Sequence, residues 1–235
     1  IMNIDVLSFG RLAHRVFEEV GQDNRTVLDD EGKNLILRKI AGNFEDELTV
    51  LKGNLKKQGY ISEVKSVISE FTQYGVDFER LDEFMDSINP DSYLYYKLKD
   101  IRKVYEGFED YLSEKYITKE EMLDVLSDAV PRSNILKGSI VAMDGFTGFT
   151  PVQDRLLGEL LKVCDKVMIT VEMDEREDPF VYRHPYQLFA LSKQMVTSLV
   201  KIARDTKTEM EDPVYLYQKP PKRFEHNAEL AFLES

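Results

Sequence analysis

The sequence predicts an α/β protein in which short parallel-sheet segments flank a long all-helical segment, and three observations support this fold class. First, an apolar run at residues 140–143 is followed by an amphipathic helix pattern and then by a second apolar run at residues 167–173. Second, an apolar run at residues 4–7 precedes another amphipathic pattern. Third, residues 29–130 carry helical periodicity with no convincing strand. The simplest architecture is a parallel-sheet domain with an inserted helical subdomain.

The strand–helix–strand pattern after residue 139 has the most specific local signals. Residues 140–143 form a continuous apolar run, which is typical of a strand buried on both faces of a parallel sheet. Thr150 can cap a helix over residues 151–163, and Gln153 stands at the capping-box spacing from it. Ligands of open α/β sheets bind outside the carboxyl ends of strands, so Asp144 occupies the position of a ligand site.

The N-terminal segment resembles the first half of a similar unit. Residues 4–7 are predicted to form a strand, after which Ser8 can cap a helix that Gly21 ends. In the helical middle, the longest helix is expected from near Ser92 to before Thr118, which opens a second capping-box pattern. The other helices of this region are expected to end at Gly42, Gly59, Gly75 and Asn89–Pro90.

The C-terminal third is predicted to contain one long helix and a connector. The helix is expected over residues 186–204, with Leu188 among its inward-facing side chains. The Pro-rich basic segment at residues 218–224 indicates a connector, and residues 227–235 indicate the opening of another helix.

Cysteine and histidine content argues against a metal site, and none is predicted. The single cysteine, Cys164, excludes an internal disulfide and leaves too few thiols for a zinc or iron–sulfur site, as expected in a reducing cytosol. His14, His184 and His226 show no metal-ligand spacing. Neither an apolar run long enough to cross a membrane nor a signal peptide is visible, so we predict a cytoplasmic location and no membrane partner.

The net charge of −12 argues against a protein that binds nucleic acid over its whole surface. Local basic strips remain, but interleaved acids favour solvated faces for Lys52, Lys56 and Lys57, for Lys97, Lys99, Arg102 and Lys103, and for the 219–223 segment. Tyr93, Tyr95 and Tyr96 could stack on single-stranded bases. Tyrosines on an amphipathic helix more often fill a core or an interface, and this interpretation is favoured.

The chemistry of the Asp144 loop is incomplete for nucleotide hydrolysis. A strand-terminal Asp can hold Mg²⁺ in nucleotide hydrolases, but the chain lacks the phosphate loop G-x-x-x-x-G-K-[ST]. Gly145 stands where a hydrolase would carry a Glu that positions water. The residues alone therefore favour a structural or vestigial role for Asp144 and a capping role for Gln153. No catalytic residue is predicted.

Two motifs resemble those of the UvrD-like helicase superfamily. "IDVLSFGRLAHRVFEEVG" resembles the motif T-F-H-S-L, which contacts single-stranded DNA in that superfamily: Ser8, Phe9 and Leu12 match, whereas Gly10 and Arg11 replace His and Ser. "MDGFTGFTPVQDRLL" resembles the motif D-E-x-Q-D-x-x-x-x-Q. Asp144 matches its first Asp and Gln153 its last Gln, and the intervening Glu, Gln and Asp are replaced by Gly145, Thr147 and Gly148.

The order and spacing of these motifs, with the long helical segment between them, resemble the AddB (RexB) family over nearly the whole chain. Members of this family are subunits of AddAB helicase–nucleases, which resect DNA double-strand breaks for homologous recombination. The resemblance implies a partial parallel-sheet, P-loop-helicase-like core piece at 1–24 and 133–215, a helical insertion at 25–132, and a connector with the start of the next domain at 216–235.

The resemblance also implies sites and partners. Ser8, Phe9 and Arg11 would lie near single-stranded DNA, and Asp144 and Gln153 near a degenerate nucleotide pocket. The partners would be an AddA-type helicase–nuclease subunit and single- and double-stranded DNA. The chain itself would hold no cofactor and be inactive alone, because the ATP/Mg-binding phosphate loop and the iron–sulfur nuclease domain of the family lie outside it. Its expected role is a DNA-scanning and assembly scaffold.

Two alternatives of other classes remain open from the residues. One is a free-standing helical protein-interaction module on a small α/β base. The other is a small α/β enzyme that uses Asp144 as an acid or base, although no partner residue can be named for it.

Overall fold

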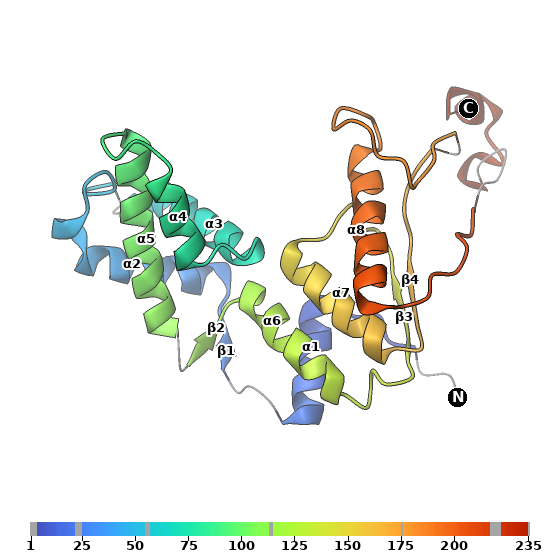
Figure 1. Ribbon diagram of the computed structural model, residues 1–235, viewed down its shortest axis with the longest axis horizontal. Coiled ribbons are helices and arrows are strands. Elements are labelled where there is room, and N and C mark those ends of the chain that lie inside the picture. Colours follow the sequence, from blue (N-terminus) through green and yellow to red (C-terminus); the bar gives the residue numbers. More distant parts are fainter. Residues whose placement is uncertain are drawn as a thin grey trace. The chain divides into compact units, whose positions relative to one another are not determined.

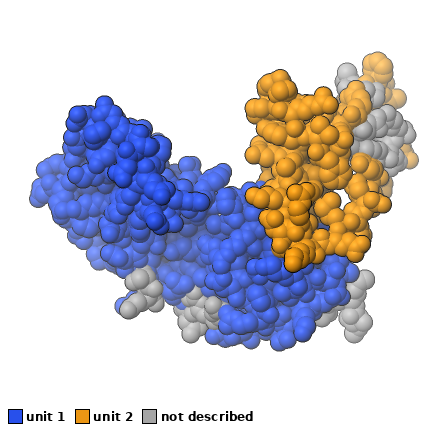
Figure 2. Space-filling view, in the orientation of Figure 1, with its two compact units in different colours: residues 1–143, 149–168 blue, residues 144–148, 169–235 orange. Residues whose placement is uncertain are grey.

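The computed structural model describes residues 4–21, 25–54, 57–112, 115–174, 176–216 and 222–234 (Figure 1). The described chain is a mixed α/β structure in which helices predominate and the strands form two-stranded sheets, β1–β2 and β3–β4. It divides into two compact units (Figure 2). Unit 1 comprises residues 1–143 and 149–168, and unit 2 comprises residues 144–148 and 169–235.

Unit 1 begins with helix α1, Phe9–Val20, which packs against helix α6. The predicted cap is confirmed, because the Ser8 hydroxyl accepts a hydrogen bond from the backbone N–H of Arg11. The predicted strand at residues 4–7 is wrong. These residues carry no strand assignment, and Val6 is 89% exposed. A strand needs a partner for its backbone hydrogen bonds, and within the described part of the chain this segment pairs with none.

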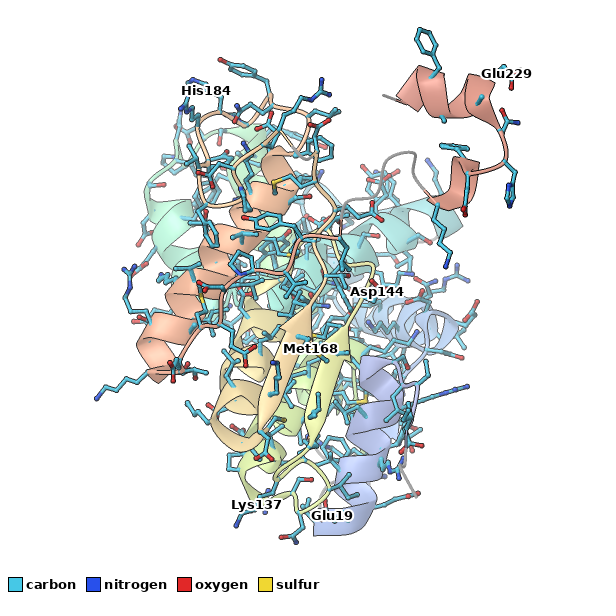
Figure 3. The ribbon with its side chains drawn as sticks, turned by 90° about the vertical axis from the view of Figure 1, so that its right-hand side faces the viewer. Glu19, Lys137, Asp144, Met168, His184 and Glu229 are labelled. Carbon is cyan, nitrogen blue, oxygen red and sulfur yellow. The ribbon has the colours of Figure 1, made fainter. Side chains whose placement is uncertain are left out.

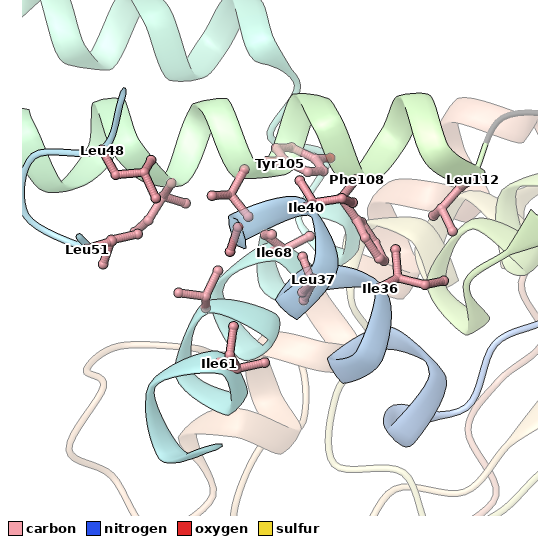
Figure 4. Close-up of a cluster of buried hydrophobic side chains, with 14 of the residues drawn as sticks. Ile36, Leu37, Ile40, Leu48, Leu51, Ile61, Ile68, Tyr105, Phe108 and Leu112 are labelled. Carbon is pink, nitrogen blue, oxygen red and sulfur yellow. The ribbon is translucent and has the colours of Figure 1, made fainter. Parts of the chain in front are cut away.

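The middle of unit 1 is a set of packed helices, as the periodicity predicted. Their bounds are α2 Asp30–Asn43, α3 Gln58–Gln73, α4 Phe78–Asp86, α5 Tyr93–Leu112 and α6 Lys119–Ala129, with short 3₁₀ turns at Glu45–Glu47 and Val130–Arg132. Gly59 was expected to end a helix but lies in the first turn of α3. Where α2, α3 and α5 meet, they bury an apolar core that includes Leu37, Leu51, Ile61, Ile68, Phe108 and Leu112 (Figure 4).

Helices α2 and α5 approach closely at Gly107. A Cβ atom at this position would lie 2.7 Å from Cε2 of Phe44 and 2.9 Å from Cγ2 of Ile40. Both distances are shorter than van der Waals contact, and one of the two neighbours is an aromatic ring in the core. Glycine is therefore required here by packing between the helices.

Gly107→Ala is expected to lower the free energy of unfolding by about 1–3 kcal/mol, because overpacking outweighs the better helix propensity of alanine. Gly59→Ala is the matched control, since a Cβ there meets nothing within 4 Å. It should leave stability unchanged or raise it by up to about 1 kcal/mol. Urea unfolding of both variants, followed by circular dichroism, measures the difference. Equal stability of the two variants would contradict the close approach.

A short parallel strand pair lies beside the helical region. Strand β1, Thr26–Val27, pairs with β2, Tyr116–Ile117, with Thr26 opposite Tyr116 and Val27 opposite Ile117. The prediction that residues 29–130 contain no strand is therefore wrong at β2. Two residues are too few to show the alternation that marks a strand, and a pairing between segments so distant in sequence depends on tertiary contacts.

The predicted order of strand, helix and strand is confirmed, but the expectation that the first strand is buried on both faces is wrong, since Ile140 is 65% exposed. Strand β3, Ile140–Met143, is followed by helix α7, Pro151–Val163, and by strand β4, Lys166–Ile169. The two strands lie side by side in one sheet and run in the same direction (Figure 3). Strand β4 is shorter than the apolar run predicted, because residues 170–174 have no regular secondary structure.

The end of α1 is tied to the turn that follows α6. The Glu19 carboxylate accepts hydrogen bonds from the Ser133 hydroxyl at 2.6 Å and from the backbone N–H groups of Asn134 and Ile135 at 2.7 and 3.1 Å. These bonds, led by that from Ser133, hold the pKa of Glu19 below its ordinary value. The contact joins two segments separated by more than a hundred residues of helical chain.

Unit 2 contains helix α8, Ala190–Thr206, and the short helix α9, Ala228–Glu234. The expected start of α8 at Tyr186 is wrong, and Leu188 is 90% exposed instead of facing inward. The reason is a local turn, in which the Gln187 side chain accepts the backbone N–H of His184 and its own N–H donates to the His184 carbonyl. Residues 218–221 of the expected connector lie outside the described residues.

Candidate functional site

Asp144 follows strand β3 and is exposed in unit 2 (Figure 3). Its carboxylate accepts a hydrogen bond from the hydroxyl of Thr170, which follows strand β4, at 2.5 Å. This hydrogen bond links the ends of two neighbouring strands, and Asp144 directly follows strand β3, as the sequence predicted.

The residue that follows Asp144 is Gly145, and the backbone conformation there favours glycine over a second carboxylate. Its φ of +78° lies in the left-handed region, which glycine adopts at no steric cost. A glutamate with this backbone conformation would be strained by about 1–3 kcal/mol. The loop geometry at this position therefore favours glycine over glutamate.

Gln153 acts as a helix cap, as the capping-box spacing predicted. Its side-chain oxygen accepts the backbone N–H of Thr150 at 2.9 Å, and its own N–H donates to the Thr150 hydroxyl at 3.4 Å. Gln153 belongs to unit 1 and Asp144 to unit 2, so each is placed only within its own unit. The side-chain oxygen that would sense a nucleotide is therefore engaged in helix capping.

Ser8, Phe9 and Arg11 lie together at the start of α1, because they are the cap and first turn of one helix. The Ser8 hydroxyl is used in the cap, and Phe9 is half-buried. The Arg11 side chain is exposed. Of the three, Arg11 has the charge and exposure needed to contact a phosphate.

Unit 2 also carries an exposed aromatic loop that was not predicted from the sequence. The rings of His184 and Tyr186 stack with centroids 5.0 Å apart and planes 6° from parallel. Tyr186 is 79% exposed, and Phe180 and Tyr182 on the same loop are 48% and 40% exposed. The signal was available as aromatic and basic residues interleaved in "PFVYRHPYQLF", but the helix expected from residue 186 obscured it.

The base of this loop is anchored to α8. Lys193, whose side chain is 4% exposed, forms an ion pair with Glu177. Arg183, which lies between Tyr182 and His184 in the sequence, is exposed. The loop thus exposes several aromatic rings and an arginine and is held at its base by this ion pair. Aromatic rings and cationic side chains together make up the stacking platforms of proteins that bind single-stranded nucleic acid.

The first two basic strips, at residues 52–57 and 97–103, lie in unit 1 and have acids close to them, as predicted. Ion pairs join Lys52 to Asp46, Arg102 to Asp82 and Glu106, and Lys103 to Glu47. Lys56 of the first strip and residues 219–221 of the third lie outside the described residues. Cations that are paired in this way bind phosphates weakly, so Lys52, Arg102 and Lys103 add little to a nucleic-acid interface.

No further chemistry converges in the described residues. Among them, no three His, Cys, Asp or Glu side chains lie close enough together to hold a metal ion. Burial raises the pKa of the Cys164 thiol, which makes the thiol less reactive.

A cavity of about 280 Å³ lies beside α2, and its lining residues are Arg38, Ala41, Gly42, Glu45, Leu48, Leu51, Lys52 and Gly53. It contains none of the predicted site residues. Nowhere in the described ranges is a helix both long and apolar enough to cross a membrane.

The fold and the Asp144 loop define a mixed α/β protein with a strand–helix–strand unit and a strand-terminal acid. Residues 1–234 match the family model described as "ADDB, N-terminal". Three similar proteins, each named as a subunit of an ATP-dependent helicase/deoxyribonuclease, come from Lachnoclostridium phytofermentans, Thermoanaerobacter sp. strain X514 and Clostridium perfringens strain SM101. They are 38%, 36% and 32% identical over 100%, 99% and 100% of this chain, which covers 21%, 20% and 20% of their own lengths.

These matches are to a region of large helicase/deoxyribonuclease subunits. The chain belongs to the AddB family. It spans about a fifth of the length of the curated relatives that it matches.

Proposed function

We propose that this chain is the part of an AddB-type subunit that holds single-stranded DNA while another subunit drives translocation. The observation that carries the proposal is the exposed His184–Tyr186 stack, with the exposed Arg183 next to His184 in the sequence. Stacking of bases on aromatic rings tolerates any sequence, and a guanidinium nearby can pair with a phosphate. Such a loop suits a protein that scans DNA.

The Asp144 loop supports a role without ATP hydrolysis. Gly145 takes the left-handed backbone position after the acid, and the oxygen of Gln153 is engaged in a helix cap. Asp144 and Gln153 are proposed to be relics of a nucleotide pocket. Any ATP/Mg site and iron–sulfur cluster of the complex would be held by residues outside this chain.

The proposed organisation follows the family resemblance. Residues 1–24 and 133–215 are proposed to be a piece of a P-loop-helicase-like core, with 25–132 as a helical insertion and 216–235 leading to the next domain. Ser8, Phe9 and Arg11 are proposed to contact single-stranded DNA. The partner would be an AddA-type helicase–nuclease subunit, and the complex would resect double-strand breaks.

Replacing both His184 and Tyr186 by Ala in the full-length subunit, assembled with its partner, is expected to weaken binding of an oligo(dT) strand about tenfold or more. The reason is that stacking contributes about 1–3 kcal/mol per base. Fluorescence anisotropy at fixed salt measures the affinity. Leu188→Ala is the matched control, because Leu188 is exposed on the same loop and carries no ring.

Unchanged affinity of the double variant for the oligo(dT) strand would contradict the proposal.

The same complex also tests the role of Asp144. Asp144→Ala should leave the rate of ATP hydrolysis unchanged, whereas a large loss would show that this loop takes part in hydrolysis.

A further inference from the structure

The α4–α5 hairpin has four exposed apolar or aromatic residues close to its loop, which we call the hairpin tip and define as Phe84, Tyr93, Leu94 and Tyr96. Their side chains are 50%, 66%, 47% and 36% exposed. Phe84 lies near the end of α4, and the other three lie in the first turns of α5, joined to α4 by a short loop (Figure 1). Of the tyrosines expected to fill a core or an interface, Tyr95 packs against the hairpin core, whereas Tyr93 and Tyr96 are exposed.

The hairpin tip is not a poorly packed core. Beneath it, Leu81, Met85 and Leu98 form a buried apolar cluster, and Tyr95 packs against that cluster. The ring of Tyr95 meets that of Tyr96 edge-on, with centroids 5.8 Å apart. The core of the hairpin is therefore complete without the side chains of the tip.

The loop at the tip is held by its own hydrogen bonds. The Ser92 hydroxyl donates to the Asn89 carbonyl at 2.6 Å and accepts the backbone N–H of Tyr95 at 3.1 Å. The Asn89 side chain accepts the N–H of Asp91 at 2.9 Å. The apolar residues thus stand on a fixed frame, and a partner would bind them at a low cost in conformational entropy.

The charge around the tip selects the kind of partner. Glu83, Asp86 and Asp91 are exposed near it, whereas Lys97, which directly follows Tyr96, is only half-exposed and Lys99 lies further along α5. These carboxylates repel the phosphates of nucleic acid. They also repel the same face of a second copy of the chain, because like charges would then meet. The favoured occupant is a protein with an apolar pocket rimmed by Lys or Arg.

We propose that the hairpin tip is a docking surface for the companion helicase–nuclease subunit, which would bind it with an apolar pocket rimmed by Lys or Arg. The inference rests on the proposed function insofar as that function requires a companion subunit. Exposed tyrosine and phenylalanine side chains on a rigid frame are frequent energetic centres of protein interfaces. The acidic rim would steer the basic partner toward them.

The test uses the full-length subunit and its companion subunit, with affinity and association rate measured by surface plasmon resonance. Wild-type protein is measured first, and a failure to bind the companion would count against the proposed function. Given wild-type binding, Tyr93→Ser combined with Leu94→Ser is expected to weaken it at least tenfold. Asp86→Lys combined with Asp91→Lys is expected to slow association severalfold and to reduce its dependence on salt.

Leu35→Ser is the matched control, because Leu35 is 68% exposed on α2 and lies far from the hairpin tip in the sequence. This variant should bind the companion subunit normally. Circular dichroism checks that each variant is folded. Unchanged binding of both double variants would overturn the inference while leaving the proposed function intact. The inference would also be overturned if the double variants bound the companion normally but lost self-association or DNA binding. The occupant of the hairpin tip would then be a second copy of the chain or nucleic acid.

Discussion

Asp100→Ala is expected to lower the free energy of unfolding of unit 1 by about 3 kcal/mol or more. The Asp100 carboxylate, in a residue that is 3% exposed, accepts backbone N–H groups from three consecutive residues of the loop after α2. The bonds to Val50 and Leu51 measure 2.7 and 2.9 Å, and Thr49 reaches the two oxygens at 3.0 and 2.9 Å. Truncation would leave these donors without an acceptor, and each such loss costs about 1–3 kcal/mol.

Loss of the Asp100 carboxylate also affects the apolar core, because the loop that it holds places Leu48 and Leu51 among the buried side chains of α2, α3 and α5. Loss of the carboxylate is expected to release both leucines. Chemical denaturation of the 235-residue chain measures the effect. Asp100→Asn keeps one acceptor oxygen and should lie between wild type and Asp100→Ala. A change below about 0.5 kcal/mol in the Ala variant would refute this account of the loop.

The features that the sequence predicted well are those with local causes. The caps at Thr118 and Thr150 depend on residues three positions apart, and both capping boxes form. The strand–helix–strand unit around α7 depends on two apolar runs and one amphipathic pattern, each read within a short window. The cap at Ser8 is equally local.

The features that were missed depend on residues far apart in sequence or on a competing local turn. The strand pair β1–β2 exists only because the helices between its strands return the chain to the same place. Asp100 looks like one more charged residue of a solvated helix, and only the fold brings the N–H groups of the loop to it. The stack at Tyr186 was hidden by apolar spacing that also fits a helix, although a hydrogen bond to the side chain of Gln187 closes a turn there.

Glu109→Gln is expected to stabilise the chain at alkaline pH and to have little effect at pH 5. Burial, followed by the charge of Glu121, the hydrogen bond between the two carboxyl groups and the charge of Asp110, raises the pKa of Glu109 from 4.5 to about 7. The folded state thus binds this proton more tightly than the unfolded chain does. Wild-type stability must therefore fall as the pH rises from about 4.5 to about 7 and stay low above that range.

Glutamine at position 109 is neutral at every pH and can still hydrogen-bond to Glu121, so the variant escapes this loss. One pKa unit corresponds to about 1.4 kcal/mol, and partial exposure of the side chain reduces the expected gain to about 1–2 kcal/mol at pH 8. Urea unfolding at pH 5 and pH 8 measures it. Glu63→Gln, exposed on α3, controls for the general benefit of removing one carboxylate from a chain with a net charge of −12. If the two variants gained equally at pH 8, the carboxyl pair between α5 and α6 would not be the origin of the pH dependence.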